Sequence, residues 1–329
     1  MAILVSLIVI LVLIVLAVGG VAAGWEYVFA VILPYLAFAV FLVGFTLRIV
    51  RWASSPVPFH IPLTAGQQKS LPWIKDSRLD NPSGTLGVVG RMILEVLFFR
   101  SLFRNVKTEI HSDGKLYYRW EKWLWLFGLV LHWSLLIILI RHLRYFTEPV
   151  PVLVGWLEGL DGLFRFGYQA FYLTDVFIVL ALTFLFLRRV VIARVKYISL
   201  ASDYFPLFLL GGIATTGILM KYVTKVDIAS IKELALGLVT FRPIVPEGIG
   251  VMFYIHLFLV CVLMAYFPFS KLMHMGGIFM SPTRNLANNS RAVRHVNPWN
   301  YPVDVHTYEE YEDEFREKMV AVGLPVEKR

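Results

Sequence analysis

The sequence is organised around two apolar stretches that each carry two histidines. WEKWLWLFGLVLHWSLLIILIRHLRYF (residues 120–146) contains His132 and His142, and GVMFYIHLFLVCVLMAYFPFSKLMHMGG (residues 250–277) contains His256 and His274. Each stretch is long enough to cross a bilayer as a helix. Because an unpaired polar group in hydrocarbon costs several kcal/mol, each of these imidazoles needs a partner.

The composition is that of a multi-span membrane protein. Hydrophobic residues make up 58% of the chain and charged residues 16%, and the mean hydropathy is +0.68. These values lie far from those of soluble domains. The net charge of +8 resides in loops between apolar runs, where basic residues report membrane topology before they report nucleic-acid binding. The single cysteine, Cys261, excludes an intrachain disulfide or a protein-held iron–sulfur cluster, so any such cluster belongs to a partner.

The fold class predicted is an all-α integral membrane protein with six transmembrane helices in a bundle. The first apolar run has no Lys or Arg before it and is long for a signal peptide, so we expect it to stay as a helix. The charged residues and turn signals between runs set the boundaries. The expected spans are residues 2–23, 25–50, 120–140, 168–187, 204–220 and 248–269.

Two segments are expected outside the bilayer. Residues 53–119 begin with Pro- and Ser-rich loop, and residues 87–104 then place charges at helical spacing in an apolar pattern. Such a helix lies on the membrane surface or under a partner, or it packs on the loops of its own chain; both interpretations are open. We expect residues 1–280 to form the membrane domain, with loop 53–119, and residues 281–329 to form a tail for partner docking.

The basic residues predict the orientation. With the N-terminus inside, 24 of the 31 Lys and Arg residues lie on the cytoplasmic side and 7 on the outer side. The reverse orientation would violate the positive-inside bias. Both termini and the large loop are therefore predicted to be cytoplasmic, which places His132 and His274 near the inner face and His142 and His256 near the outer face.

Two histidines at each of two depths are what axial ligation of two b-type haems requires. On straight helices the gap between His132 and His142 is about 15 Å of rise and that between His256 and His274 about 27 Å, a mismatch that a bend at Pro268 reduces. The eighteen-residue gap is five turns, which puts His256 and His274 on one face. The alternative is that the four imidazoles hydrogen-bond across helices, as in a proton-relaying transporter or a structural anchor. Zinc is disfavoured, because it usually takes three or four close ligands.

Residues near the histidines fit more than one role. Gly128, Gly276 and Gly277 leave room for a porphyrin or for close helix packing. Arg141 and Arg144 are placed to meet haem propionates or to snorkel to the interface.

The histidine spacing resembles the cytochrome b, or gamma, subunits of the respiratory nitrate reductase family, over roughly residues 25–280. The segment FPFSKLMHMGGIFMSPTRNLANNSRAVRHVNPW (residues 267–299) is more similar still to DsrM-type subunits, the haem b membrane subunits of DsrMKJOP complexes in sulfur-metabolising prokaryotes. Six spans instead of five is a departure from the nitrate reductase pattern.

The resemblance implies a di-haem electron-transfer subunit in the cytoplasmic membrane, and not a stand-alone enzyme. Electrons would be exchanged between menaquinol or menaquinone near the outer face and a DsrK-like iron–sulfur subunit in the cytoplasm, in dissimilatory sulfur metabolism. His132 and His274 carry over as ligands of the inner haem, and His142 and His256 as ligands of the outer haem.

A quinol site needs a proton acceptor near the outer haem. Asp175 lies at that depth, near the start of the fourth expected span, where a carboxylate is costly unless it is functional or caps the helix. The proton acceptor and the helix N-cap are both open interpretations. Arg165 and Tyr168 lie just before it and are expected to contact a quinone carbonyl.

Overall fold

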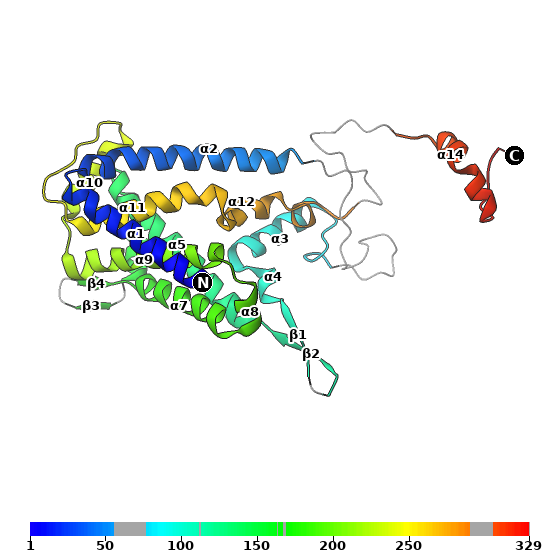
Figure 1. The fold of residues 1–329 in the computed structure, drawn as a ribbon, viewed down its shortest axis with the longest axis horizontal. Coiled ribbons are helices and arrows are strands. Elements are labelled where there is room, and N and C mark those ends of the chain that lie inside the picture. The colour runs from blue at the N-terminus through cyan, green and yellow to red at the C-terminus, as the bar shows by residue number, and fades with distance from the viewer. Residues whose placement is uncertain (56–76, 112, 163, 167–168, 290–304, 329) are drawn as a thin grey trace.

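Long helices dominate the structure (Figure 1). The structure is a computed structural model and describes residues 1–55, 77–111, 113–162, 164–166, 169–289 and 305–328. In these ranges five helices are long and apolar enough to cross a membrane. They are α1 (Ala2–Ala22), the π-helix η1 with α2 (Val28–Ile32 and Leu33–Ala53), α5 (Lys122–Phe146), α9 with the π-helix η2 (Ala201–Leu219 and Met220–Thr224), and α11 with the 3₁₀ helix η3 (Val251–Tyr266 and Phe267–Phe269).

A further long helix, α7 (Leu173–Val191), packs against α5 and α9 but differs from these five. Three charged side chains, those of Asp175, Arg188 and Arg189, lie within its 19 residues. The expected start of this span at residue 168 is wrong. The chain first makes an antiparallel hairpin, and the backbone of Tyr172 is still extended. The strands of the hairpin are β3 (Phe164–Phe166) and β4 (Gln169–Phe171).

Two apolar clusters hold the bundle together. The larger one joins α1, η1, α9, α10 and α11, and the smaller one joins α5, α7 and α9. Leu209 of α9 and Leu259 of α11 are completely buried in the larger cluster, and Ala181 of α7 is completely buried in the smaller one. Helix α9 contributes to both clusters, and it therefore connects the half of the bundle that contains α5 to the half that contains α11.

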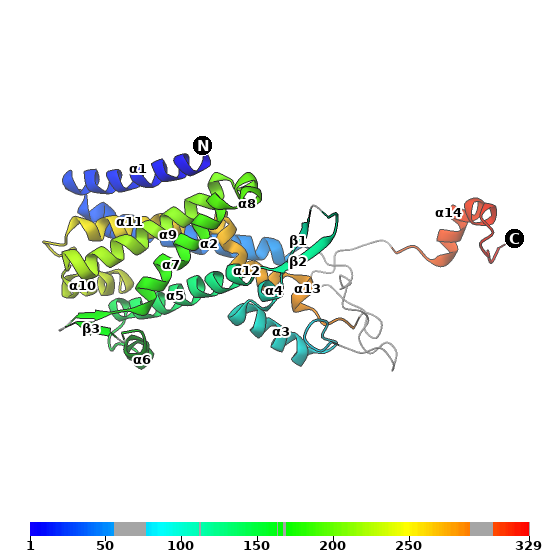
Figure 2. The same cartoon turned by 90° about the horizontal axis from the view of Figure 1, so that it is seen from below.

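The shorter elements gather at the two ends of the bundle (Figures 1 and 2). One end carries the β3–β4 hairpin and two short helices, and the other carries the N-terminus and most remaining elements. Connections at both ends are expected when successive long helices run in opposite directions. The first end has α6 (Val152–Asp161) and α10 (Ile228–Val239); the second has α3 (Thr85–Phe98), α4 (Arg100–Phe103), β1 (Val106–Ile110), β2 (Leu116–Trp120), α8 (Ala193–Ile198), α12 (His274–Gly277) and α13 (Pro282–Asn285).

Helix α3 packs its charged face, not its apolar face, on the rest of the chain. Arg91 and Glu95 are buried, and Glu95 forms an ion pair of 2.9 Å with Arg284 of α13. Burial, and then the charge of Arg284, lower the pKa of Arg91. Of the two interpretations of residues 87–104, packing on the protein's own segments accounts for this charged face. The apolar side chains of α3 are exposed; they are Leu86, Val89, Ile93 and Leu97.

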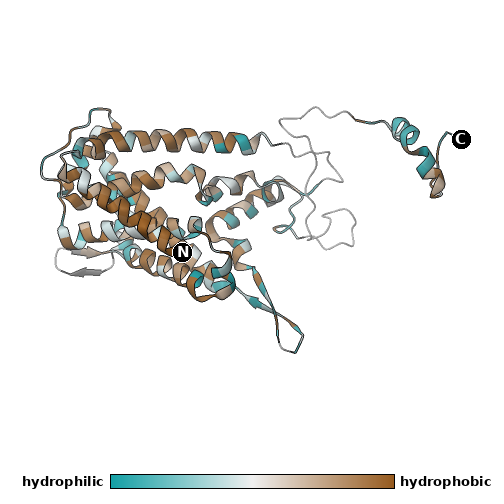
Figure 3. Ribbon diagram, viewed as in Figure 1, coloured by the Kyte–Doolittle hydropathy of each residue, from teal (hydrophilic) through white to brown (hydrophobic). Residues whose placement is uncertain are grey.

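The C-terminal segment contains one more helix, α14 (Tyr308–Ala321), which is hydrophilic, in contrast to the apolar spans (Figure 3). It starts with a capping box, in which Thr307 and Glu310 accept hydrogen bonds from each other's backbone N–H. The carboxylate of Glu312 accepts the backbone N–H groups of Glu327 and Lys328 at 2.7 and 2.9 Å. The last residues therefore fold back onto α14.

Candidate functional site: two pairs of histidines

The first pair lies at the end of the bundle that carries α3, α4 and α12. The imidazoles of His132, from α5, and His274, the first residue of α12, have ring centroids 5.8 Å apart and ring planes at 75°. A metal bound about 2 Å from one nitrogen of each of two imidazoles holds the ring centres roughly 6 Å apart. The spacing of this pair therefore fits axial ligation of one iron.

His274 reaches its partner because the sixth span is broken. Helix α11 ends at Tyr266, Pro268 lies in η3, and the backbone of Ser270 is extended before a second 3₁₀ turn leads to α12. Proline cannot continue the helical hydrogen bonding. The expectation that His256 and His274 share one helix face is therefore wrong, and the predicted bend at Pro268 is present. The two remaining 3₁₀ turns here are η4 (Lys271–Met273) and η5 (Ile278–Met280).

The second pair lies toward the opposite end. His142 is in the last third of α5, and His256 lies near the start of α11. His256 Nδ1 is 2.9 Å from the hydroxyl of Thr216 on α9. The hydroxyl oxygen also lies 2.8 and 3.0 Å from the carbonyl oxygens of Gly212 and Ile213, which can only accept its single hydrogen. Thr216 therefore accepts a hydrogen bond from Nδ1–H of His256.

All four imidazoles are oriented through the same nitrogen. His132, His142 and His274 place Nδ1 at 2.7, 2.7 and 2.8 Å from the backbone carbonyls of Gly128, Ile138 and Lys271. A carbonyl only accepts, so each Nδ1 carries the proton and each Nε2 keeps its lone pair. Histidines that ligate metals are usually held in this way, with the non-ligating N–H donating to a backbone or side-chain oxygen.

The helices that carry the two pairs are held apart by other helices. Helix α5 packs mainly on α7 and α10, whereas α11 packs on α1, α2 and α9. Within the described residues, α5 and α11 are not among the closely packed pairs. The rings of His132, His142 and His274 belong to exposed residues, and His256 is half-buried. His132 and His142 on α5 and His256 on α11 therefore belong to helices that are connected mainly through other helices.

Residues between α3 and α4 pack against the first pair. The ring of Phe99 meets that of His132 edge-on, with centroids 4.9 Å apart, and its backbone has φ of 52°. A bulky residue in this left-handed region is strained, and such strain often marks a functional position. The indole N–H groups of Trp125 and Trp133, both on α5, donate to the carbonyls of Phe98 and Leu97 at 2.7 and 3.0 Å. They thereby satisfy the last carbonyls of α3 and fix the α3–α4 elbow beside His132.

The glycines near this pair serve close packing between segments. A Cβ at Gly276 would come within 2.6 Å of Ile49 on α2, and one at Gly277 would contact Trp52 on the same helix. Gly128 is buried near Leu102 of α4. Of the two roles expected for Gly276 and Gly277, the structure supports packing against α2.

A polar cluster surrounds His142 at the other end. Asp161, at the end of α6, pairs with Arg141 at 2.7 Å and accepts the backbone N–H of Thr174 at 2.9 Å. The carboxylate that caps α7 is therefore that of Asp161, and the predicted capping role of Asp175 is wrong. Arg144 pairs with Glu158 of α6 at 2.5 Å. The buried Nε atom of Arg141 has no hydrogen-bond partner within the described part of the chain.

Asp175 faces α9 and η2 instead. Its carboxylate pairs with the ammonium of Lys221 at 3.1 Å and accepts the hydroxyl hydrogen of Tyr222 at 2.6 Å. The ammonium of Lys221 also lies 3.1 Å from the ring centroid of Tyr172, and the guanidinium of Arg141 lies 3.4 Å from it. Such contacts between a cation and an aromatic ring are attractive. The cluster thus holds a partly buried carboxylate, a phenol and two cations next to His142.

Sequence reasoning missed Asp161, Thr216, Lys221 and Tyr222. Each contacts a partner on a different helix, so the residue spacing within one segment does not predict the contact. The one available signal was Lys221–Tyr222 at the end of an apolar run, a position usual for interfacial residues. The expected quinone contacts are not described: Tyr168 and the side chain of Arg165 lie outside the described residues.

Side chains alone do not form a metal cage in the described ranges. No group of three or more His, Cys, Asp or Glu residues converges there as it would around a metal ion. A haem supplies most of its iron's ligands itself and asks the protein for one or two axial ones. The donor set present, two imidazoles at each of two levels, fits that requirement.

Comparisons with known proteins show the family of the chain. Residues 92–296 match the family model described as nitrate reductase gamma subunit. That match begins inside α3 and leaves α1 and α2 outside, whereas we had expected the resemblance over roughly residues 25–280. The chain is 46% identical over 285 residues to the Hdr-like menaquinol oxidoreductase cytochrome b-like subunit of Archaeoglobus fulgidus, covering 84% of this chain and 85% of that protein. The protein of the same name from Archaeoglobus profundus is 43% identical over 274 residues, with 81% of each chain covered. The chain therefore belongs to the nitrate reductase gamma subunit family.

Proposed function

We propose that this protein is a di-haem cytochrome b subunit of a membrane-bound menaquinol oxidoreductase. His132 and His274 would be the axial ligands of an inner haem b, and His142 and His256 those of an outer one. The observation that carries the proposal is that all four imidazoles have Nδ1 fixed by an oxygen acceptor. The names of the two relatives, cytochrome b-like subunits of menaquinol oxidoreductases, support the same conclusion.

The proposed topology has six spans, with α7 as the fourth, and both termini in the cytoplasm. The charges of α7 lie near its ends, where Asp175 and the Arg188–Arg189 pair can reach the interfaces. With six spans and the excess of basic residues on one side, the α3–α12 end would lie at the inner face of the cytoplasmic membrane. Residues 1–280 would form the membrane domain and residues 281–329 the cytoplasmic docking tail.

The chain's own residues would hold the cofactors and manage protons. Bound haem b supplies reversible one-electron transfer. The helices fix the imidazoles, and the separation of His132 and His142 along α5 would set the distance between the two haem sites. Arg141 and Arg144, which each neutralise one carboxylate of α6, would also face the propionates of the outer haem. Propionates are acceptors, and the unpaired Nε of Arg141 is a donor.

The polar cluster beside His142 is the proposed quinol site. Quinol oxidation releases protons, and Asp175 has a carboxylate that is already hydrogen-bonded to the phenol of Tyr222. Lys221 stabilises the charged carboxylate, so Asp175 would accept a proton and pass it outward. Arg165 and Tyr168, in the neighbouring hairpin region, would contact a quinone carbonyl.

The proposed partner is a cytoplasmic iron–sulfur subunit of the DsrK type, in a complex like DsrMKJOP that serves dissimilatory sulfur metabolism. The chain's single cysteine requires that any cluster belong to a partner. The exposed apolar side chains of α3, at the end nearest the inner pair, offer a surface for such a subunit or for the membrane interface.

A reduced-minus-oxidised absorption spectrum of the purified complex, with haem extracted and counted per chain, tests the proposal. We expect a b-type spectrum and two haems per chain. A colourless protein would instead support the second candidate, a transporter or structural anchor whose intramembrane histidines relay protons or pair polar groups. That candidate is favoured by one observation only, the hydrogen bond between His256 and Thr216 across two helices.

A further inference from the structure

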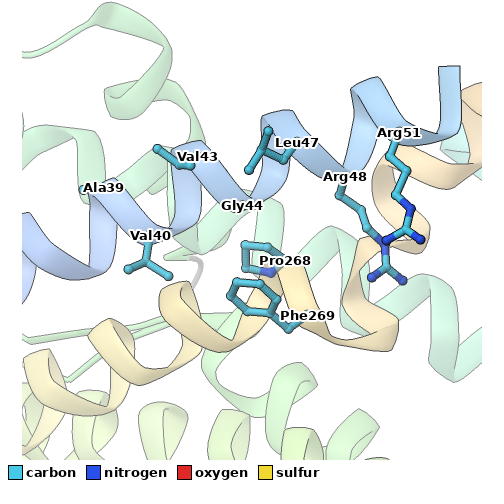
Figure 4. Close-up of a pocket in the computed structure, with 9 residues that line it drawn as sticks. All are labelled: Ala39, Val40, Val43, Gly44, Leu47, Arg48, Arg51, Pro268 and Phe269. Atoms are coloured by element: carbon cyan, nitrogen blue, oxygen red, sulfur yellow. The ribbon is translucent and has the colours of Figure 1, made fainter. Parts of the chain in front are cut away.

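An open cavity lies on the outside of the bundle, between α2 and the break after α11 (Figure 4). Its volume is about 550 Å³, which is in the range of small-molecule sites. It is apolar along most of its length and basic at one end. It is lined by Ala39, Val40, Val43, Gly44, Leu47, Arg48 and Arg51 of α2 and by Pro268 and Phe269 of η3.

The cavity extends along α2 over about the thickness of one bilayer leaflet. Its lining on α2 runs from Ala39, in the middle of the candidate span Val28–Ala53, to Arg51 near its end. These twelve residue steps correspond to about 18 Å of helix rise. Half of a hydrocarbon core of about 30 Å is a similar length. The apolar part of the cavity therefore lies at the depth of acyl chains, and the basic end lies at the depth of headgroups.

The two arginines at the basic end lack the counter-charge that other arginines of the bundle have. Arg188 pairs with Glu121 at 3.0 Å and Arg141 with Asp161 at 2.7 Å. Arg48 and Arg51 are both exposed, and neither forms an ion pair with a carboxylate of the described residues. The guanidinium of Arg48 lies 5.1 Å from the ring centroid of Trp52. The side chains of Arg48 and Arg51 extend from α2 toward the same end of the cavity (Figure 4).

We propose that this cavity binds one anionic phospholipid of the inner leaflet, with its phosphate between Arg48 and Arg51 and an acyl chain along Val40, Val43 and Leu47. Arginine is suited to phosphate because its planar group donates two parallel hydrogen bonds. Basic pockets on the cytoplasmic side of transmembrane helices are a known form of lipid headgroup site. The proposal does not depend on haem or quinol; it takes only the cytoplasmic orientation of the α2 C-terminus from the proposed function.

Native mass spectrometry of the purified complex, titrated with phosphatidylglycerol or phosphatidylcholine, tests the proposal. We expect one tightly retained phosphatidylglycerol and at least tenfold weaker retention of phosphatidylcholine. The double variant R48Q/R51Q should lose at least tenfold in phosphatidylglycerol retention. As a control, R194Q/K196Q removes two exposed cations of α8 from the same predicted face and should leave retention unchanged.

The variant Val43→Trp tests the apolar part of the cavity independently of its basic end, because it fills the apolar part and leaves both arginines in place. It should weaken retention of the intact lipid, and soluble glycerol phosphate should not compete with that lipid. Equal retention of the two lipids, or unchanged retention in R48Q/R51Q, would overturn the proposal. So would a Val43→Trp variant that keeps its lipid but loses a partner subunit, since the cavity would then hold a partner's helix. The melting temperature and elution profile of each sample show that the variants are folded, and haem content reports on the proposed function separately.

Discussion

The two histidine pairs are built in different ways. The pair His142–His256 sits within continuous helices, and a third helix orients it through Thr216. The pair His132–His274 has one ligand beyond a helix break, and the strained Phe99 of the α3–α4 elbow lies against the other. The pair His142–His256 is therefore fixed by the bundle itself. The pair His132–His274 is assembled from short segments at the α3–α12 end, where an electron-accepting partner would dock in the proposed function.

Removing single ligands should give the largest effect and test whether the pairs are independent. In His256→Ala, the haem content of the purified complex should fall from two to one per chain, since an iron with one axial imidazole is held poorly. His274→Ala should also leave one haem, and the spectrum and midpoint potential of the remaining haem should differ between the two variants. If either variant lost both haems or neither, the assignment of two separate sites would be wrong.

Among the described residues, the end of the bundle beside His142 carries a partly buried carboxylate bonded to a phenol, so this is the end that we expect to support proton release. Asp175→Asn keeps the shape of the side chain but removes its charge, and it should slow menaquinol oxidation roughly a hundredfold, as is usual for loss of a positioned base. The assay is menaquinol-analogue oxidation, with the haem spectrum as a check on folding.

Glu158→Gln is the matched control for Asp175→Asn. It removes a carboxylate of the same polar cluster, one that neutralises Arg144. It should leave the rate within a few-fold of the original. An equal loss of rate in the two variants would mean that the cluster matters for its charge balance and not for a proton acceptor.

Local sequence patterns predicted the features of this structure that depend on residues close together in the chain. Apolar length predicted five helices that are long and apolar enough to cross a membrane, whereas the fourth predicted span corresponds to α7, which starts later and carries three charged residues. Residue identity within the spans predicted that His132 and His274 lie together. The bend near Pro268 followed from the missing amide of proline, but the 3₁₀ turns that bring His274 toward His132 did not. Asp175 was singled out by its depth, yet its partners Lys221 and Tyr222 lie 46 and 47 residues away along the chain.

For α3 the sequence left two interpretations open, and the spacing of its charges did not show that the charged face would be the buried one. Charges at helical spacing normally face water, but here Glu95 is enclosed by Arg284 and the backbone N–H of Ser101. Phe99 gave no signal either, because a left-handed backbone is expected at glycine and not at a bulky aromatic. Both features arise from contacts between distant segments, which a single sequence does not display.

Thr216 offers a finer test of the difference between the ends. Thr216→Val removes the acceptor of His256 Nδ1–H at nearly constant volume. Loss of the hydrogen-bond partner of a ligating histidine typically weakens a metal site by roughly tenfold or more. We expect faster loss of the outer haem on dilution, with the inner haem unchanged. Thr216→Ser keeps the hydroxyl and should behave as the original protein. A change confined to the inner haem would contradict the assignment of His256 to the outer pair.

The smallest effect is expected at Phe99, where two substitutions separate strain from contact. Phe99→Ala removes the ring from His132 but leaves a non-glycine residue at a φ of 52°. Phe99→Gly also removes the ring and relieves a strain of roughly 1 to 3 kcal/mol. If the ring orients His132, both variants should shift the midpoint potential of the inner haem by a similar amount. The glycine variant should then melt at a higher temperature than the alanine variant, because only it recovers the strain energy. A shift in the potential of the outer haem would contradict this role of the ring. So would an inner-haem potential that changes with thermal stability and not with loss of the ring, since the elbow would then support the bundle in general and would not position His132.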